Sequence, residues 1–149
     1  MIAFINHKQL EEAQNIRRVF QASYRVEAQL LGAINFPPLS RLLDEFYNCS
    51  NDFVGYYEGH KLLAVIEMKN ELSNMHIQSL VVDPDYFRKG IARKLITFVL
   101  DHYDTNQFTV ETGRDNIPAR KLYEDFEFEL EKTYTAAENI IKVRYQRNR

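Results

Sequence analysis

The chain has 149 residues, a net charge of −2 at pH 7, and 45% apolar residues. This length and composition are typical of one globular domain with its own core, which excludes a disordered chain. The near-neutral charge gives no electrostatic reason to expect nucleic-acid or membrane binding, and no apolar run approaches the roughly 20 residues of a membrane helix. We therefore expect a single domain over residues 1–149, located in the cytoplasm, because the N-terminal residues lack the features of a signal peptide.

Cysteine and histidine usage points away from metal and thiol chemistry. The single cysteine, Cys49, cannot form an internal disulfide, and no histidine lies near it in the chain. A small buried apolar side chain is therefore a better interpretation of Cys49 than a catalytic nucleophile. One cysteine and four scattered histidines provide no spacing typical of a zinc site, so we expect no bound metal.

The first part of the chain predicts a short strand and two helices. Residues 2–5 are apolar and extended in character, and apolar residues then recur three and four positions apart over Leu10–Tyr24. This pattern predicts an amphipathic helix that continues towards Gly32. The segment Phe36-Pro37-Pro38 ends it, because proline cannot continue a helix, and a second short helix is expected over 39–47.

The remaining elements alternate in a way that indicates a mixed α/β domain. Strands at 53–57 and 62–69 flank the turn Glu58-Gly59-His60, which is typical of a hairpin, and a third strand covers 75–82. Further along, we expect elements in the order helix, strand, helix, strand and strand, at 89–103, 108–112, 117–125, 126–135 and 140–146. The sheet should be mostly antiparallel, with one crossover in the second half.

Residues 83–92 connect an apolar strand to a helix whose first turn contains Gly90 and Ala92. The first N–H groups of a helix lack internal partners and carry the positive end of the macrodipole, and small residues let a phosphate approach them closely. Four basic residues surround this turn: Arg88, Lys89, Arg93 and Lys94. From the residues alone, a phosphate site and a basic, solvated helix start both remain open.

The same stretch resembles the acyl-CoA signature of the GNAT superfamily of N-acetyltransferases, Gln/Arg-x-x-Gly-x-Gly/Ala, preceded by a strand ending in Val-x-Pro-x-Tyr. Gly90 and Ala92 match the signature. The strand end matches at Val82, Pro84 and Tyr86. Phe87 occupies the position of the usual Gln or Arg, with Arg88 directly after it.

A second block, residues 116–128, is similar to the family's Asn-x-x-Ala-x-x-x-Tyr-x-x-x-Gly-Phe. The matching residues are Asn116, Ala119, Tyr123 and Phe128. Glu127 replaces the usual glycine, which predicts a different backbone turn before the next strand. A helix and a strand separate the two blocks, as in the family, and the N-terminal half of the chain agrees in element order only.

The resemblance implies a GNAT-like acyl-CoA N-acyltransferase fold, with a central, mostly antiparallel sheet flanked by about four helices. It implies an N-acetyltransferase that moves an acetyl group from acetyl-CoA to a primary amine of a small molecule or peptide. The amine would attack directly in a ternary complex, in a monomer or homodimer that binds neither nucleic acid nor membrane. The alternative is a CoA-binding sensor or regulatory module with little catalysis.

The resemblance also implies which residues bind the co-substrate acetyl-CoA. Strand residues would pair with the pantetheine arm through their backbone groups: Leu80, Val81 and Val82. N–H groups at the helix start would hold the pyrophosphate: Arg88, Lys89, Gly90, Ile91, Ala92 and Arg93. Asn116 would hydrogen-bond the end of the pantetheine, cap the helix that begins at Ile117, or do both.

Tyr123 is the expected general acid, because a phenol near the sulfur can protonate the departing CoA thiolate. The alternative is a tyrosine that only packs in the core. The general base stays open. His76 lies where some family members carry a catalytic Glu, Glu67 in the preceding strand is a rival, and a chain of water molecules is a third possibility. His76 could instead be a quiet strand residue, and Glu67 a solvent-facing carboxylate.

By analogy with the family, the acceptor should enter between the first two helices and the sheet. The residues expected there are Tyr24, Arg25, Glu27 and the loop Phe36-Pro37-Pro38. Glu27 could attract an amine, although an ordinary surface carboxylate is the simpler interpretation. No residue in this region identifies the substrate.

Overall fold

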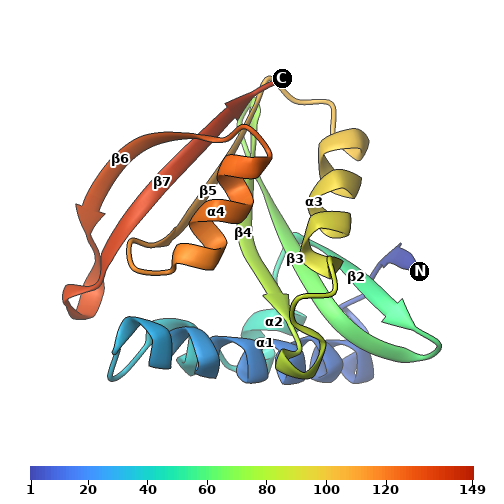
Figure 1. Cartoon of the computed structure of the whole chain (residues 1–149). Coiled ribbons are helices and arrows are strands. Elements are labelled where there is room, and N and C mark those ends of the chain that lie inside the picture. Colours follow the sequence, from blue (N-terminus) through green and yellow to red (C-terminus); the bar gives the residue numbers. More distant parts are fainter.

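Seven strands form one mixed sheet in the computed structural model, which describes residues 1–149 (Figure 1). The strands are β1 (Ile2–Phe4), β2 (Asp52–Glu58), β3 (Lys61–Glu71), β4 (Asn74–Val82), β5 (Gln107–Gly113), β6 (Glu129–Thr135) and β7 (Ile141–Asn148). The helices are α1 (Leu10–Leu31), α2 (Leu43–Tyr47), α3 (Ile91–His102) and α4 (Ile117–Asp125). Short 3-10 turns cover Pro37–Ser40, Pro84–Tyr86 and Ala137–Asn139.

The strand order is β1-β2-β3-β4-β5-β7-β6, and every neighbouring pair is antiparallel except β4 and β5. The chain leaves β4, passes through α3 and returns as β5, which gives the one parallel pair its crossover helix. The expected mixed α/β sheet, mostly antiparallel with a crossover in the second half, is therefore confirmed.

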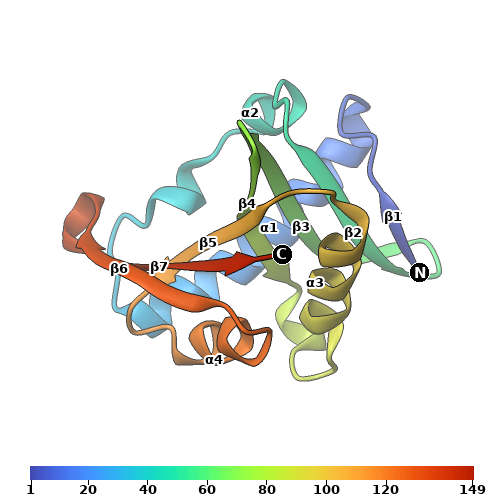
Figure 2. The same cartoon turned by 90° about the horizontal axis from the view of Figure 1, so that it is seen from above.

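Helices cover both faces of the sheet. Consecutive residues of a strand point to opposite faces, so Val65 and Ile66 of β3 belong to two different cores. Ile66 packs in the core beneath α3 and α4, and Val65 packs in the core beneath α1 and α2. Figure 2 shows α1 running beneath the central strands, while α3 and α4 lie over the other face. The sheet is thus sandwiched at its centre.

Helix α1 ends where the sequence indicates. Gly32 caps it in the left-handed conformation, with φ of 63°, which glycine adopts without a steric penalty. The second predicted helix, over 39–47, is wrong in its first half. Pro37–Ser40 forms a 3-10 turn, Arg41 is extended, and α2 begins only at Leu43. At this break the Arg41 side chain forms an ion pair with Glu67, with 2.7 Å between Nη1 and Oε1.

The prediction of a different turn at Glu127 is also wrong. Glu127 takes φ of 66°, the left-handed conformation that a glycine favours at this place. The N–H of Glu127 donates to the carbonyl of Glu124, and the N–H of Phe128 donates to the carbonyl of Tyr123, which is the pattern of a Schellman cap. The C-terminus of α4 therefore forms the turn that is typical of glycine with a glutamate at this position.

No helix of the structure is both long and apolar enough to cross a membrane.

Candidate functional site

The site begins where two central strands part. β4 and β5 pair only as far as Ile77 and Val110, although β4 continues to Val82 and β5 to Gly113. At the same point β4 carries a bulge: Glu67 of β3 lies opposite Ser79 and Met68 lies opposite Ile77, which leaves Gln78 as the extra residue. The diverging strand ends expose backbone groups between the two sheet faces.

Two cavities flank this opening. The first, here called the α3 cavity, has a volume of about 560 Å³ and extends from the loop before α3 to Tyr123 on α4. The second, the α2 cavity, has about 620 Å³ and lies between the Phe36–Ser40 segment, α2 and the turn before β7. Six residues line both cavities and define what we call the junction: Tyr24, Glu27, Gln78, Ser79, Glu111 and Thr112.

The loop before α3 is shaped to accept an anion. Arg88 and Gly90 take positive φ values of 64° and 77°, which folds the backbone tightly ahead of the helix. The first bond within α3 runs from the N–H of Lys94 to the carbonyl of Gly90, and no side chain caps the helix, so its first N–H groups are free. A Cβ at Gly90 would meet no atom within 4 Å, so the loop is open on that side. Free N–H groups at a helix start favour negative charge.

Most of the predicted cofactor residues line the α3 cavity. These are Leu80, Val82, Arg88, Gly90, Ile91, Ala92, Arg93, Asn116 and Tyr123. Two predicted residues do not line it. The side chain of Val81 is 1% exposed and packs in the core beneath α1, so only its backbone faces the neighbouring strands. The Lys89 ammonium instead lies 5.3 Å from the centre of the Tyr86 ring.

Tyr123 is held by the turn that ends α4. Its ring packs against Phe128, with 5.8 Å between ring centroids, and the residue is 5% exposed. Its hydroxyl makes no hydrogen bond within the protein. Because every fully buried side-chain oxygen of the structure has a hydrogen-bond partner, this hydroxyl is not fully buried. It faces the α3 cavity, which Tyr123 lines. Burial raises the pKa of Tyr123, so the phenol keeps its proton at neutral pH.

Asn116 connects three elements. Its Oδ1 accepts from the N–H of Ala119 at 3.2 Å and caps α4, so the expected capping role is confirmed. Its Nδ2 donates to Oε1 of Glu27 at 2.9 Å, across the junction to α1. Thr112 of β5 donates to the same Glu27 oxygen at 3.5 Å. The start of α4, the end of β5 and the last turns of α1 are therefore tied together beside the α3 cavity.

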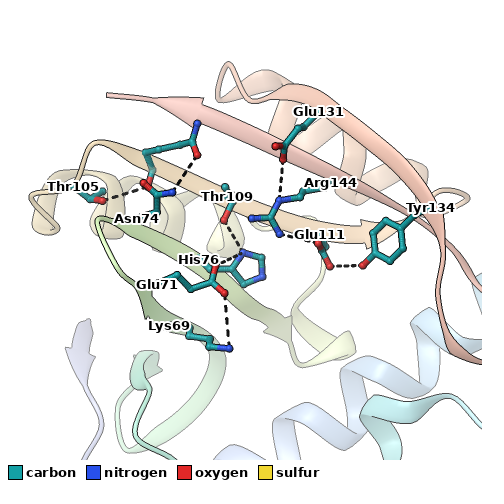
Figure 3. Close-up of polar contacts among 11 residues, drawn as sticks. Lys69, Glu71, Asn74, His76, Thr105, Thr109, Glu111, Glu131, Tyr134 and Arg144 are labelled. Atoms are coloured by element: carbon teal, nitrogen blue, oxygen red, sulfur yellow. Dashed lines mark hydrogen bonds and ion pairs between the residues drawn. The ribbon is translucent and has the colours of Figure 1, made fainter.

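His76 lies apart from these residues. It sits on β4 before the strands part, and it lines neither cavity. Its Nδ1 is 2.7 Å from the hydroxyl of Thr109 and 4.0 Å from a carboxylate oxygen of Glu71 (Figure 3). Burial lowers the pKa of His76, with the charge of Glu71 opposing this effect, so the ring is neutral at pH 7. The structure does not bring His76 together with Tyr123.

Glu67 is not the solvent-facing carboxylate that we considered, because it is 0% exposed. Its Oε1 accepts from Arg41 at 2.7 Å and from Ser79 at 3.0 Å, and its Oε2 accepts from Arg41 and Asn51, each at 2.9 Å. Burial alone would raise the pKa of Glu67, but these hydrogen bonds and the charge of Arg41 hold it below its usual range. We call Arg41, Asn51, Glu67 and Ser79 the Glu67 cluster.

Cys49 borders the Glu67 cluster and is less apolar in its surroundings than its sequence context indicates. The residue is only partly buried, and its Sγ lies 3.6 Å from Oε2 of Glu67 and accepts from the N–H of Asn51 at 3.4 Å. It lines neither of the two cavities. The cysteine therefore supports the cluster from outside the junction.

Glu111 is a junction residue that the sequence analysis missed. Its Oε1 accepts from the hydroxyl of Tyr134 at 2.5 Å and its Oε2 from Arg144 at 2.9 Å (Figure 3). Burial opposes ionisation, but the bonds from Tyr134 and Arg144 lower the pKa of Glu111. One signal could have found it: Glu111 is the lone charged residue inside an otherwise uncharged strand that leads directly to Asn116.

Of the residues expected near the acceptor, all but one line the α2 cavity. Tyr24 and Glu27 of α1 and the segment Phe36-Pro37-Pro38 line the α2 cavity, whereas Arg25 lines neither cavity. Glu27 is not an ordinary surface carboxylate, because burial raises its pKa against the opposing bonds from Asn116 and Thr112 and the charge of Lys142. The last turns of α1 thus form one wall of the junction.

The sequence of this chain matches a known protein family. Residues 13–128 match the family model described as the acetyltransferase (GNAT) family. A curated relative, the UPF0157 protein YqkA of Bacillus subtilis, is 34% identical over 142 residues; the alignment covers 95% of this chain but only 41% of YqkA.

Solved structures agree with the fold. The ribosomal-protein-S18-alanine N-acetyltransferase from Escherichia coli superposes with a TM-score of 0.79 at 16% identity, over 99% of this chain and 92% of that one. The PaiA N-acetyltransferase from Thermoplasma acidophilum, solved in complex with coenzyme A, superposes with a TM-score of 0.74 at 17% identity, over 100% and 99% of the two chains. Because the family model matches residues 13–128, well over half of the sequence, the chain belongs to the acetyltransferase (GNAT) family.

Proposed function

We propose that this protein transfers an acetyl group from acetyl-CoA to a primary amine, by direct attack of the amine on the thioester. One observation carries the proposal: the opening between β4 and β5 connects a free helix N-terminus at α3 to the Tyr123 hydroxyl and continues into a second cavity. Such a passage has room for a long co-substrate on one side and an acceptor on the other.

The α3 cavity suits the co-substrate. The first N–H groups of α3 would hold the pyrophosphate, with the positive φ of Arg88 and Gly90 turning the backbone towards it. Beyond the bulge, Leu80 and Val82 have no partner strand on the β5 side, which leaves room for an extended arm to pair with them in the manner of an added strand. The N–H of Val82, which donates to the Ser23 hydroxyl at 3.4 Å, would exchange that bond for one to the arm. Both features lead the thioester towards the junction.

The junction suits the reaction. Tyr123 would donate its proton to the sulfur as the carbon–sulfur bond breaks, since its raised pKa keeps it protonated until then. The α2 cavity, reached through the junction, would hold the acceptor between aromatic residues of α1 and the Pro37–Ser40 turn. Its volume of about 620 Å³ lies within the range of small-molecule sites.

The experiment that tests this function combines cofactor binding with turnover. We expect saturating CoA to raise the melting temperature, because a ligand of the native state stabilises it. We expect thiol release from acetyl-CoA when a panel of small primary amines and amino-terminal peptides is supplied. A melting shift without thiol release on any amine would favour a CoA-binding sensor, and no shift would remove CoA from the proposal.

A further inference from the structure

We propose that Glu27 is the general base that takes the proton from the acceptor amine. This inference rests on the proposed acyl transfer and assigns a step that the family resemblance left open. Glu27 lies in the last turns of α1 and lines both cavities, so it faces the place where an amine from the α2 cavity would meet a thioester in the α3 cavity.

The hydrogen bonds of Glu27 hold one oxygen and leave the other available. Asn116 and Thr112 both donate to Oε1, at 2.9 and 3.5 Å. No group of the protein donates to Oε2. Every fully buried side-chain oxygen of the structure has a hydrogen-bond partner, so Oε2, which has none, is not fully buried. Glu27 is therefore oriented through Oε1, while Oε2 is available to accept a proton.

The other carboxylates near the opening lack this combination. Both oxygens of Glu67 accept hydrogen bonds, and the residue is 0% exposed. Both oxygens of Glu111 are occupied, one by Tyr134 and one by the cation of Arg144. Glu45 is exposed and its Oε1 caps its own helix by accepting from the N–H of Leu42.

The electrostatic surroundings suit a base as well. Burial raises the pKa of Glu27, so it holds a proton more strongly than Glu67 or Glu111, whose pKa values are lowered. The charged and titratable groups that line the cavities with it are Tyr24, Arg41, Glu45, Tyr86, Arg88, Arg93, Glu111, Tyr123 and Lys142. Of the cations among these, Arg41 is paired with Glu67 and Arg93 with Asp125, and the charge of Lys142 is the one that opposes the rise in the pKa of Glu27.

The acceptor arrives as an ammonium ion, and Oε2 of Glu27 takes one of its protons, which frees the nitrogen lone pair. The carbon–nitrogen bond then forms and the carbon–sulfur bond breaks. Tyr123 donates its hydroxyl proton to the sulfur, and the second proton lost by the nitrogen restores the tyrosine. The products are an amide, a thiol and one proton, which Glu27 releases to solvent.

The test uses two amines of nearly the same shape but different basicity, ethylamine and trifluoroethylamine. At mildly alkaline pH the first is mostly an ammonium ion and the second is mostly neutral. We expect Glu27→Gln to lower kcat/KM for ethylamine by about 10²-fold, the usual contribution of a general base. The loss for trifluoroethylamine should be at least about tenfold smaller, because its nitrogen needs no base before attack. Glutamine retains an oxygen that can accept from Asn116.

The matched control is Glu11→Gln, which makes the same change on an exposed residue in the first turn of the same helix. We expect it to leave both rates unchanged. An unchanged melting shift with CoA would show that Glu27→Gln keeps the cofactor site intact.

Three outcomes separate the possibilities. Equal losses for the two amines would overturn the base role and leave Glu27 as a structural residue. Wild-type rates in Glu27→Gln, with the ethylamine-specific loss appearing in Glu111→Gln instead, would move the role to Glu111. A wild-type protein that releases no thiol with these amines or with the wider panel would overturn the proposed acyl transfer itself.

Discussion

The Glu67 cluster and the junction both place a carboxylate beside the bulge of β4, but their chemistry differs. In the cluster, both carboxylate oxygens of Glu67 accept hydrogen bonds, which come from Arg41, Asn51 and Ser79. At the junction, Glu27 has one oxygen bound by Asn116 and the other open. A saturated carboxylate stabilises a fold, whereas a half-satisfied one is able to exchange a proton.

The cluster also explains how the wall of the α2 cavity is positioned. Arg41 comes from the extended segment before α2, and its guanidinium lies 4.1 Å from the centre of the Phe46 ring. Glu67 and Ser79 come from β3 and β4 on either side of the bulge. The ion pair thus joins the segment that lines the α2 cavity to the strands that form the opening.

The largest expected effect is on stability, in the Glu67 cluster. Replacing Arg41 with alanine leaves a buried carboxylate without its cation, so we expect the free energy of unfolding to fall by about 3–5 kcal/mol in urea denaturation near neutral pH. Lys121→Ala removes an exposed lysine that pairs with Asp125 at 3.3 Å and should cost much less, because exposed ion pairs contribute little. Similar losses in the two variants would contradict the distinction between cluster and surface.

The loss of stability in Arg41→Ala should depend on pH. In the wild type the pKa of Glu67 is lowered, so its stabilising contribution is present above the unfolded pKa and disappears as pH falls through the folded pKa. In Arg41→Ala, burial acts without the opposing cation and raises the pKa, so protonation relieves the penalty. The difference in unfolding free energy between the two proteins should therefore shrink as pH is lowered from about 7 to about 5.

The next largest effect is expected on turnover at the junction. Tyr123→Phe keeps the packing against Phe128 and removes only the hydroxyl, so we expect kcat to fall by about 10²-fold while the Kd for CoA changes little. Steady-state thiol release and calorimetric CoA titration provide the two numbers. Tyr103→Phe is the control, because its hydroxyl bonds to Asp52 away from both cavities and its loss should leave kcat unchanged. A Tyr123→Phe variant with wild-type kcat would assign the tyrosine to packing alone.

A smaller effect separates the two roles of Asn116. Asn116→Ala removes the cap of α4 and should lower the free energy of unfolding by about 1 kcal/mol. Asn116→Ser keeps an oxygen for the cap but loses the bond to Glu27, so its stability should be close to that of the wild type. Both variants should reduce kcat/KM for the amine. If serine restored activity together with stability, the bond to Glu27 would have no catalytic importance.

The smallest effect is expected at the turn that holds Tyr123. Glu127 is left-handed, so Glu127→Gly should raise the free energy of unfolding by less than about 1 kcal/mol, measured by thermal melting. The same change at Glu129, at the start of β6, should instead destabilise by a similar amount, because glycine weakens a strand. A loss of stability in Glu127→Gly would mean that the Glu127 side chain contributes more than its backbone costs.

Local patterns predicted most of the elements and the loop before α3. Gly32 and Gly59 lie at turns with positive φ, and the strand-to-helix passage at 83–92 has the free N–H groups that its sequence indicates. The helix predicted over 39–47 was wrong in its first half, where Arg41 is extended and forms an ion pair with Glu67, a residue far away in the chain. Propensity describes the segment by itself and contains no information about such a contact.

The sequence by itself determined the family, the order of the elements, and the residues of the loop and of α4, because these depend on short-range spacing. It named Tyr123 and Asn116, which line the α3 cavity. Only the tertiary structure decided which acidic residue is available for chemistry. Glu27, Glu67 and Glu111 look alike in the sequence, and they differ because folding saturates two of them with cations and leaves one oxygen of the third open.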